Sequence, residues 1–287
     1  MATQISFGGD MGNRWASGGL SGTRDVFRAL HSGLTVDLIA TPVHELKTCT
    51  PHELISDVLQ HNPEDFDFLP VVDETHRFAG MFHAAAHRGR RTLGTVWQCY
   101  VPLSEDYLLG ADASILEFVL DADEKQCRLV ISGTKVVGLV SLSDLQRLPV
   151  RAALFALITG LEMTMADLIR MRYPESQHWM RVLTSGRQAK IEEERKKAKS
   201  DDGYVDTLLF TQFCDKREIL TRELAEPEGR ALSATLESIE ALRNSVAHAN
   251  EYASSPAEAK NVCKIARELL HLTDHFQDQL SATGLAK

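Results

Sequence analysis

The chain has 287 residues, of which 25% are charged and 44% hydrophobic, a composition typical of a soluble globular protein with a real core. Its 31 basic and 40 acidic residues give a net charge of −9, which excludes a protein that coats double-stranded DNA or a membrane through a basic surface. Five dispersed cysteines and the lack of a signal pattern predict free thiols in the cytoplasm, and the absence of any run of 18 apolar residues predicts no membrane span.

Residues 1–32 differ from the rest of the chain in composition. They carry six glycines and show little apolar periodicity. We therefore expect a loosely ordered lead segment, with a short helix over 25–31.

Between residues 33 and 150 a unit of helix, strand, turn, strand and helix occurs twice, with a period of about 58 residues. Two copies of one small unit usually pack together, because neither copy buries enough surface alone. The pattern predicts an α+β module of two αββα units. The expected elements are a helix over 53–60 begun by Thr50 and Pro51, strands over 69–73 and 78–82, a helix over 114–120, and strands over 127–131 and 136–140.

From about residue 150 the pattern is helical to the end of the chain. In one expected helix, aliphatic residues recur every three or four positions, as in an amphipathic helix that packs on a core. We therefore expect a second domain over 151–287, an all-α bundle. The expected helices cover 150–169, 186–199, 206–224, 230–250 and 256–280.

The end of the second repeat places a glycine, two hydroxyls and a carboxylate where a strand meets a helix, at Gly138, Ser141, Ser143 and Asp144. A carboxylate can hold two adjacent ribose hydroxyls, and a hydroxyl beside the N–H groups of a helix N-terminus suits a phosphate. This chemistry predicts a site for a nucleoside phosphate. In the alternative interpretation, Ser141 and Asp144 only cap the helix.

The doubled unit and its Gly-x-x-Ser/Thr-x-x-Asp ending resemble a pair of CBS domains, and the ending is especially similar to the AMP-binding repeats of the gamma subunit of AMP-activated protein kinase. The resemblance covers roughly residues 33–148. It implies that Ser141, Ser143 and Asp144 contact a regulatory adenine nucleotide such as AMP or ATP. Some CBS pairs bind no ligand and serve as dimerisation modules, which is the alternative.

The first repeat departs from this pattern, because His83 stands in place of the hydroxyl and Ala86 in place of the acid. We therefore expect at most one good nucleotide site per chain. A basic loop with Arg88, Arg90 and Arg91 follows in the same repeat, and its guanidinium groups are candidate phosphate ligands.

The helix expected over 230–250 carries Arg243, Asn244 and His248. Helical spacing turns Asn244 and His248 to one face, away from the aliphatic stripe, and the long Arg243 side chain can reach the same face. A guanidinium can neutralise charge on a phosphate, an imidazole can transfer the proton of a ribose 2′-hydroxyl, and an amide can orient either group. Because no Asp/Glu cluster accompanies them, the set predicts phosphodiester chemistry without a metal.

This Arg-x4-His string within a bundle of five expected helices resembles the HEPN superfamily, over roughly residues 151–287. The resemblance implies a metal-independent ribonuclease whose site is formed by two copies of Arg243, Asn244 and His248 across a homodimer. In the alternative interpretation the bundle has no activity, and Arg243 pairs with Glu237 or Glu240.

Together these patterns predict a ribonuclease that a nucleotide-binding CBS pair regulates, in a toxin-like or defence setting. The alternative is an adenine-nucleotide-binding scaffold without catalysis, whose bundle only dimerises or recruits a partner. The expected partners are RNA and a second copy of the chain through both domains, with no metal, membrane or double-stranded DNA. Glu162, an acid in the first apolar helix of the bundle, lies either against Arg243 or on an edge.

Overall fold

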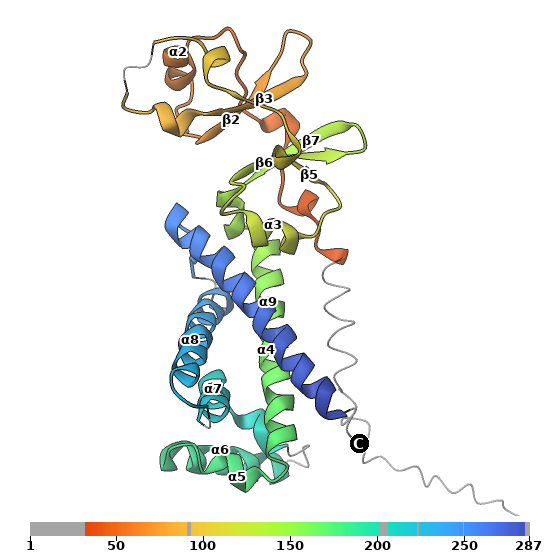
Figure 1. The fold of residues 1–287 in the computed structure, drawn as a ribbon, viewed down its shortest axis with the longest axis vertical. Coiled ribbons are helices and arrows are strands. Elements are labelled where there is room, and N and C mark those ends of the chain that lie inside the picture. Colours follow the sequence, from red (N-terminus) through yellow and green to blue (C-terminus); the bar gives the residue numbers. More distant parts are fainter. Residues whose placement is uncertain (1–31, 91–92, 201–205, 223, 249, 285–287) are drawn as a thin grey trace, which may run out of the picture. The chain divides into compact units, whose positions relative to one another are not determined.

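The computed structural model describes residues 32–90, 93–200, 206–222, 224–248 and 250–284 (Figure 1). The expected helix over 25–31, and all of the lead segment but Ser32, lie outside these residues. The described chain divides into two compact units. The repeat unit comprises the described residues of 32–154 and 248–266, and the helical unit those of 155–247 and 267–284.

The repeat unit contains the predicted α+β motif twice. Both strand pairs are antiparallel hairpins, so the predicted order of helix, strand, turn and strand is confirmed in each copy. Each copy ends in a short 3-10 helix instead of the expected α-helix. The elements are α2 (Ile55–Gln60), β2 (Phe68–Val72), β3 (Phe78–His83) and η4 (Ala84–His87), then α3 (Ile115–Asp121), β6 (Cys127–Ser132), β7 (Lys135–Ser141) and η7 (Leu142–Gln146).

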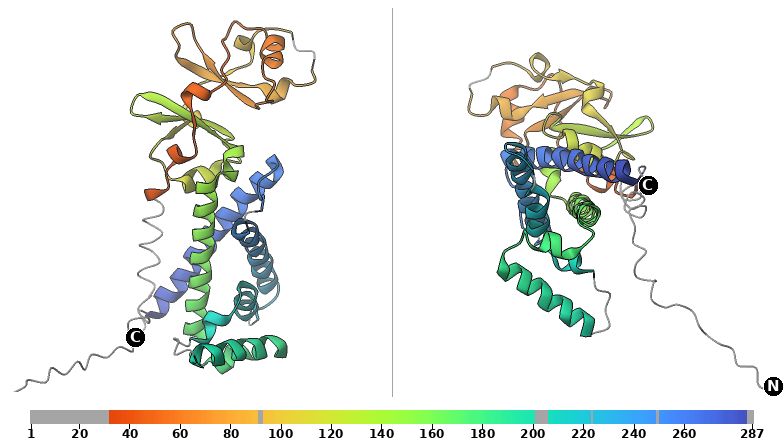
Figure 2. Two further views of the ribbon diagram at one scale, coloured as in Figure 1. Left: turned by 180° about the vertical axis from the view of Figure 1, so that it is seen from behind. Right: turned by 60° about the horizontal axis from the view of Figure 1, so that its bottom comes forward.

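Three very short strands complete the sheets: β1 (Thr41–Pro42), β4 (Val101–Pro102) and β5 (Leu108–Gly110). In the described residues one sheet has the order β1-β7-β6-β5 and the other the order β2-β3-β4, and Figure 2 shows these strands from two further directions. β1 precedes the first copy in the sequence but pairs antiparallel with β7 of the second copy. The hydrophobic pattern did not predict these strands, because two or three residues are too short for a periodic signal.

Two equivalent glycines explain how the edge strands fit. Gly138 in β7 lies under β1, and a Cβ atom there would lie 2.6 Å from the carbonyl oxygen of Thr41. Gly80 in β3 lies under β4, where a Cβ atom would overlap the carbonyl oxygen of Val101. Close backbone approach therefore requires glycine at the same place in both copies.

Local signals set the ends of the short elements. The Ser114 hydroxyl accepts the Leu116 N–H at 3.2 Å and caps α3, which begins one residue after the expected start at 114. The expected start of the first helix at Thr50 is wrong, because the chain first makes a turn and Leu54 is the N-cap of α2. Gly133 forms the β6–β7 turn with a φ of 59°, a conformation that favours glycine.

The helical unit contains the predicted helices, but the structure divides one of them and adds another. The single helix expected over 206–224 is instead a 3-10 helix followed by a shorter α-helix, because the Asp206 carboxylate accepts the Leu208 N–H and that of Asp215 caps a new start at Gln212. A short helix, α5, was not expected. The elements are α4 (Leu148–Arg172), α5 (Ser176–Met180), α6 (Ser185–Ser200), η8 (Thr207–Phe210), α7 (Phe213–Thr221), α8 (Glu228–Ala247) and α9 (Pro256–Gly284).

α4 is long and apolar enough to cross a membrane, by length and composition alone. The expectation that no segment would pass such a test relied on unbroken apolar runs and did not foresee this stretch. Most of the stretch is buried within the chain, as in the core helix of a folded protein. Its first residues, like the first residues of α9, belong to the repeat unit, and the rest of both helices belongs to the helical unit.

Candidate functional site

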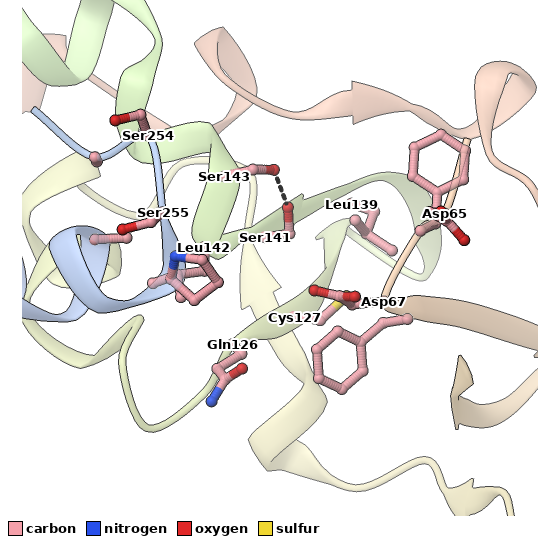
Figure 3. Close-up of a pocket in the computed structure, with 15 residues that line it drawn as sticks. Asp65, Asp67, Gln126, Cys127, Leu139, Ser141, Leu142, Ser143, Ser254 and Ser255 are labelled. Atoms are coloured by element: carbon pink, nitrogen blue, oxygen red, sulfur yellow. Dashed lines mark hydrogen bonds between the residues drawn. The ribbon is translucent and has the colours of Figure 1, made fainter. Parts of the chain in front are cut away.

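The repeat unit holds a cavity of about 300 Å³ (Figure 3). Its walls come from both copies of the motif and from the segment that leads into α9. The lining residues are Asp65, Phe66, Asp67, Phe68, Gln126, Cys127, Leu139, Ser141, Leu142, Ser143, Ala253, Ser254, Ser255, Pro256 and Ala259. Two of the three residues predicted to bind a nucleotide, Ser141 and Ser143, are therefore together at one cavity.

Hydroxyl groups form much of the polar lining. The Oγ atoms of Ser141 and Ser143 lie 2.9 Å apart and share a hydrogen bond, drawn as the dashed line in Figure 3. Ser254 and Ser255 contribute two further hydroxyls from the segment before α9. Each hydroxyl both donates and accepts, so the lining suits a ligand that itself carries hydroxyl and amino groups.

Asp144, the third predicted residue, does not line the cavity. Its carboxylate is buried and accepts the Ser141 N–H and the Arg147 Nε–H, each at 2.6 Å, so that it caps the start of η7. Burial outweighs these bonds and raises the pKa of the carboxyl. The geometry is that of the capping alternative, and ribose binding by Asp144 stays a prediction.

The helix end expected to bind a phosphate is also engaged. η7 has five residues, and the Leu142 N–H at its start donates to the Gln126 carbonyl at 2.9 Å. The Ser141 N–H is taken by Asp144. The turn therefore offers fewer free donors than the sequence suggested.

In the basic loop of the first repeat, Arg88 pairs with two aspartates of the same repeat. Arg88 Nη1 donates to Asp67 Oδ1 at 2.9 Å, and Arg88 Nε lies 3.4 Å from Asp65 Oδ1. Arg91 lies outside the described residues. Of the described residues that line the cavity, none is a lysine or an arginine.

Aromatic side chains supply the apolar part of the cavity wall. Phe66 is 48% exposed and lines the cavity. Phe68 stacks on His83, with ring centroids 4.4 Å apart and planes 6° from parallel. His83 replaces the hydroxyl of the other repeat, and its observed contact is with Phe68.

The segment that closes the cavity is anchored at several points. The Tyr252 hydroxyl donates to the Leu145 carbonyl at 2.6 Å, and the Arg151 guanidinium lies 4.8 Å from the centre of the Tyr252 ring. Further along, Ser254 Oγ donates to Glu258 Oε2 at 2.6 Å. The sequence did not predict this wall, because nothing local in residues 250–259 indicates a partner more than a hundred residues away.

The repeat itself could have indicated other missed residues. Asp67 and Phe68 at the start of β2 are equivalent to Gln126 and Cys127 at the start of β6, and all four line the cavity. A comparison of the two hairpins would have placed these positions together.

The second motif begins on α8, in the helical unit. Arg243 is partly exposed, and its Nε lies 3.5 Å from Glu162 Oε2. The other oxygen of Glu162 accepts from the buried Lys216 ammonium at 3.0 Å. Of the two placements expected for Glu162, the structure has the one against Arg243, and Asn244 beside it is exposed.

For an inactive bundle, Arg243 was expected to pair with Glu237 or Glu240, but both acids lie against a different arginine. Glu240 and Glu237 lie 3.1 and 3.5 Å from Arg217 of α7. The ion pair of Arg243 is instead with an acid of α4.

His248 is exposed and lies in a turn, because α8 ends at Ala247 and not at Asn250 as expected. The Asn250 carbonyl accepts a bond from Arg151 at 2.8 Å, which holds the chain out of the helical path. The helix expected to carry both Asn244 and His248 therefore ends one residue before His248, and the shared face of the two side chains stays a prediction. Arg243 and Asn244 belong to the helical unit and His248 to the repeat unit. In the part of the chain that the structure describes, no group of three or more His, Cys, Asp or Glu side chains could hold a metal ion.

No protein family matches the chain, and no curated protein does. Among solved structures, the chain is similar to the ATP-bound CBS domain of a bacterial CNNM/CorC-family Mg2+ transporter, with 20% identity over 42% of this chain and 90% of that one and a TM-score of 0.35. It is also similar to the CBS domains of a transcriptional regulator from Streptococcus pneumoniae, with 16% identity over 38% of this chain and 94% of that one and a TM-score of 0.33. A third similar structure is that of CBSX2 in complex with AMP, with 21% identity over 42% of this chain and 96% of that one and a TM-score of 0.32.

Proposed function

We propose that the repeat unit is a CBS-type sensor that binds an adenine nucleoside or nucleotide in its cavity. One observation carries the proposal: four serine hydroxyls and an accessible aromatic ring meet in one cavity of about 300 Å³. The face of Phe66 can stack on a base, and the Ser141–Ser143 pair can exchange hydrogen bonds with ribose hydroxyls. Such a cavity joins an apolar wall to a few convergent polar groups, as small-molecule sites do.

Calorimetry of the full chain with adenosine, AMP and ATP tests this function. Ser141→Ala removes a hydroxyl and Phe66→Ala removes the ring, and each is expected to weaken binding about fivefold to tenfold, the value of one good hydrogen bond or stacked contact. Ser56→Ala, an exposed serine of α2 outside the cavity, is the matched control. Failure of the wild type to bind any of the three compounds rejects the function but not the fold.

We further propose that Arg243, Asn244 and His248 cleave RNA without a metal, in a homodimer that pairs two copies of the set, and that the sensor regulates this step. What supports it is accessibility: Asn244 and His248 are exposed, and the Arg243 side chain is 38% exposed. The contact with Glu162 neutralises part of the Arg243 charge, so an RNA phosphate must compete with that carboxylate.

Cleavage of a labelled RNA by the purified chain in the presence of EDTA tests this second function. Arg243→Ala and His248→Ala are each expected to lower the rate at least about a hundredfold, the usual scale of lost acid–base or charge stabilisation. Arg230→Ala, an exposed arginine at the start of the same helix, should leave the rate unchanged. Equal cleavage by all variants indicates contamination. Ligand binding without cleavage supports the non-catalytic scaffold instead.

A further inference from the structure

The charges around the cavity decide whether it can accept the phosphates of a nucleotide. The inference drawn from them rests on the proposed function. Asp65 and Asp67 both line the cavity. Glu258 lies directly behind Ser254, and Asp144 directly behind Ser141, each in hydrogen-bond contact with that serine. Four carboxylates therefore lie at or immediately behind the walls.

The neighbouring cations are fewer and already paired. Arg88 contacts Asp65 and Asp67, and Arg147 contacts Asp144. Neither guanidinium is among the described lining residues. Four carboxylates and these two guanidiniums leave a net of two negative charges. If Arg151, which lies against the Tyr252 ring, is counted as well, one negative charge remains, so the potential inside the cavity is negative.

The backbone donors that could offset this potential are used within the chain. At η7 the Ser141 N–H is bound by Asp144, and that of Leu142 by the Gln126 carbonyl. At the start of α9 the Ser254 N–H donates to Glu258 Oε2 at 3.0 Å. The Glu258 N–H donates to Ser255 Oγ at 3.2 Å. A phosphate would meet acidic side chains at both of the helix starts where free N–H groups would otherwise stabilise it.

We propose that the cavity recognises an uncharged or cationic adenine nucleoside and discriminates against phosphate at the 5′ position. The hydroxyls and carboxylates accept the hydrogen-bond donors of ribose and adenine. Each added phosphate brings negative charge into a negative cavity without gaining a cation. Affinity therefore falls from adenosine to AMP and again to ATP, the reverse of the order expected for a site that grips phosphates.

A charge series tests the proposal on the full chain at low ionic strength. The probes are 5′-amino-5′-deoxyadenosine, adenosine, AMP and ATP, which change the charge at one position of the same nucleoside. We expect the amino compound to bind at least as tightly as adenosine, and AMP about tenfold more weakly than adenosine. Added salt should narrow the difference between adenosine and AMP, because it screens the repulsion.

Substitutions identify which carboxylates disfavour the phosphate. Asp67→Asn and Asp65→Asn, made separately, should each reduce the ratio of adenosine affinity to AMP affinity by several fold, while the affinity for adenosine stays nearly unchanged. Glu74→Gln removes an exposed acid of the same repeat outside the cavity lining, and should leave the affinity difference between adenosine and AMP as in the wild type. Tighter binding of AMP or ATP than of adenosine overturns the proposal and leaves the nucleotide-sensing function intact. Failure of all four probes to bind rejects both.

Discussion

At the scale of single residues, the ion pair of the buried Lys216 ammonium makes a direct prediction about stability. Its side chain is 6% accessible, and it donates to Glu162 and to the Thr211 carbonyl at 2.9 Å. Lys216→Met keeps the apolar stem but leaves Glu162 with one fewer partner in a largely buried place. We expect the free energy of unfolding of the helical unit to fall by about 3 kcal/mol, the usual cost of breaking a buried ion pair.

Urea denaturation can measure this loss through the fluorescence of Trp179, which is buried in α5, with Trp15 and Trp97 replaced by phenylalanine. Lys190→Met, at an exposed position of α6, is the control and should cost less than about 0.5 kcal/mol. Equal effects of the two substitutions would show that the Lys216–Glu162 contact contributes nothing to stability.

Asp144 gives a pH dependence whose sign follows from its burial. Its pKa is raised in the folded chain above the ordinary 3.8, so the folded state holds its proton to a higher pH than the unfolded state does. Stability contributed by this group is therefore highest below pH 3.8 and falls as the pH rises through the raised pKa.

Comparison with Asp144→Asn isolates that contribution. The difference in unfolding free energy, wild type minus variant, should decrease as the pH rises from the ordinary pKa of the carboxyl toward neutrality. Trp97 fluorescence in a chain without Trp15 and Trp179 reports on the repeat unit. A difference that grows with pH would mean that the bond to Arg147 outweighs burial.

Residue types alone brought the sequence analysis to Ser141 and Ser143, because hydroxyls at the end of a strand are a local signal. They could not show that Asp144 turns inward, since a carboxylate three residues into a turn is equally suited to a cap and to a ligand. Nor could they place Ser254 at the same cavity, because that contact depends on packing between distant segments.

At the scale of elements, the equivalent glycines of the two hairpins make a sharp prediction. A Cβ atom on Gly138 would lie 2.6 Å from the Thr41 carbonyl oxygen, too close without a shift of β1 away from β7. Gly138→Ala should therefore destabilise the repeat unit by about 2 kcal/mol or more, as strain at a closely packed backbone does. Gly80→Ala should have a similar effect through β4.

Thermal or urea unfolding of the repeat unit, followed by Trp97, measures both substitutions. Gly33→Ala is the matched control, since a Cβ atom there meets nothing within 4 Å. If Gly138→Ala behaved like this control, the edge strand would not be held as closely as the structure has it.

The elements that the sequence could predict are those with a periodic pattern. Hairpins and long amphipathic helices have periodic patterns, and the structure confirms them. β1 and β4 are too short for periodicity, but a different signal was present: the segments over 35–42 and 95–102 both begin Thr-Val and end in Pro, sixty residues apart. That spacing matches the repeat, and it would have placed one edge strand on each sheet.

At the scale of the whole molecule, the two compact units share two helices. α4 and α9 each contribute residues to both units, so unfolding one unit removes part of the support of a helix in the other. The sequence does not indicate this division, because both helices run without a break across the boundary. Such sharing favours cooperative unfolding over independent domains.

We therefore expect the Trp97 and Trp179 signals to report coincident urea transitions, one probe lying in each unit. A ligand that binds the cavity at a hundred times its Kd should raise the stability reported by both probes by about 2.7 kcal/mol, because binding to the folded state stabilises everything that unfolds with it. If the ligand raised only the stability reported by Trp97, the two units would unfold independently of each other. In that case ligand binding in the repeat unit could not change the population of any state of Arg243 in the helical unit, and regulation through Arg243 would be excluded; only His248, which belongs to the repeat unit, could still respond to the ligand.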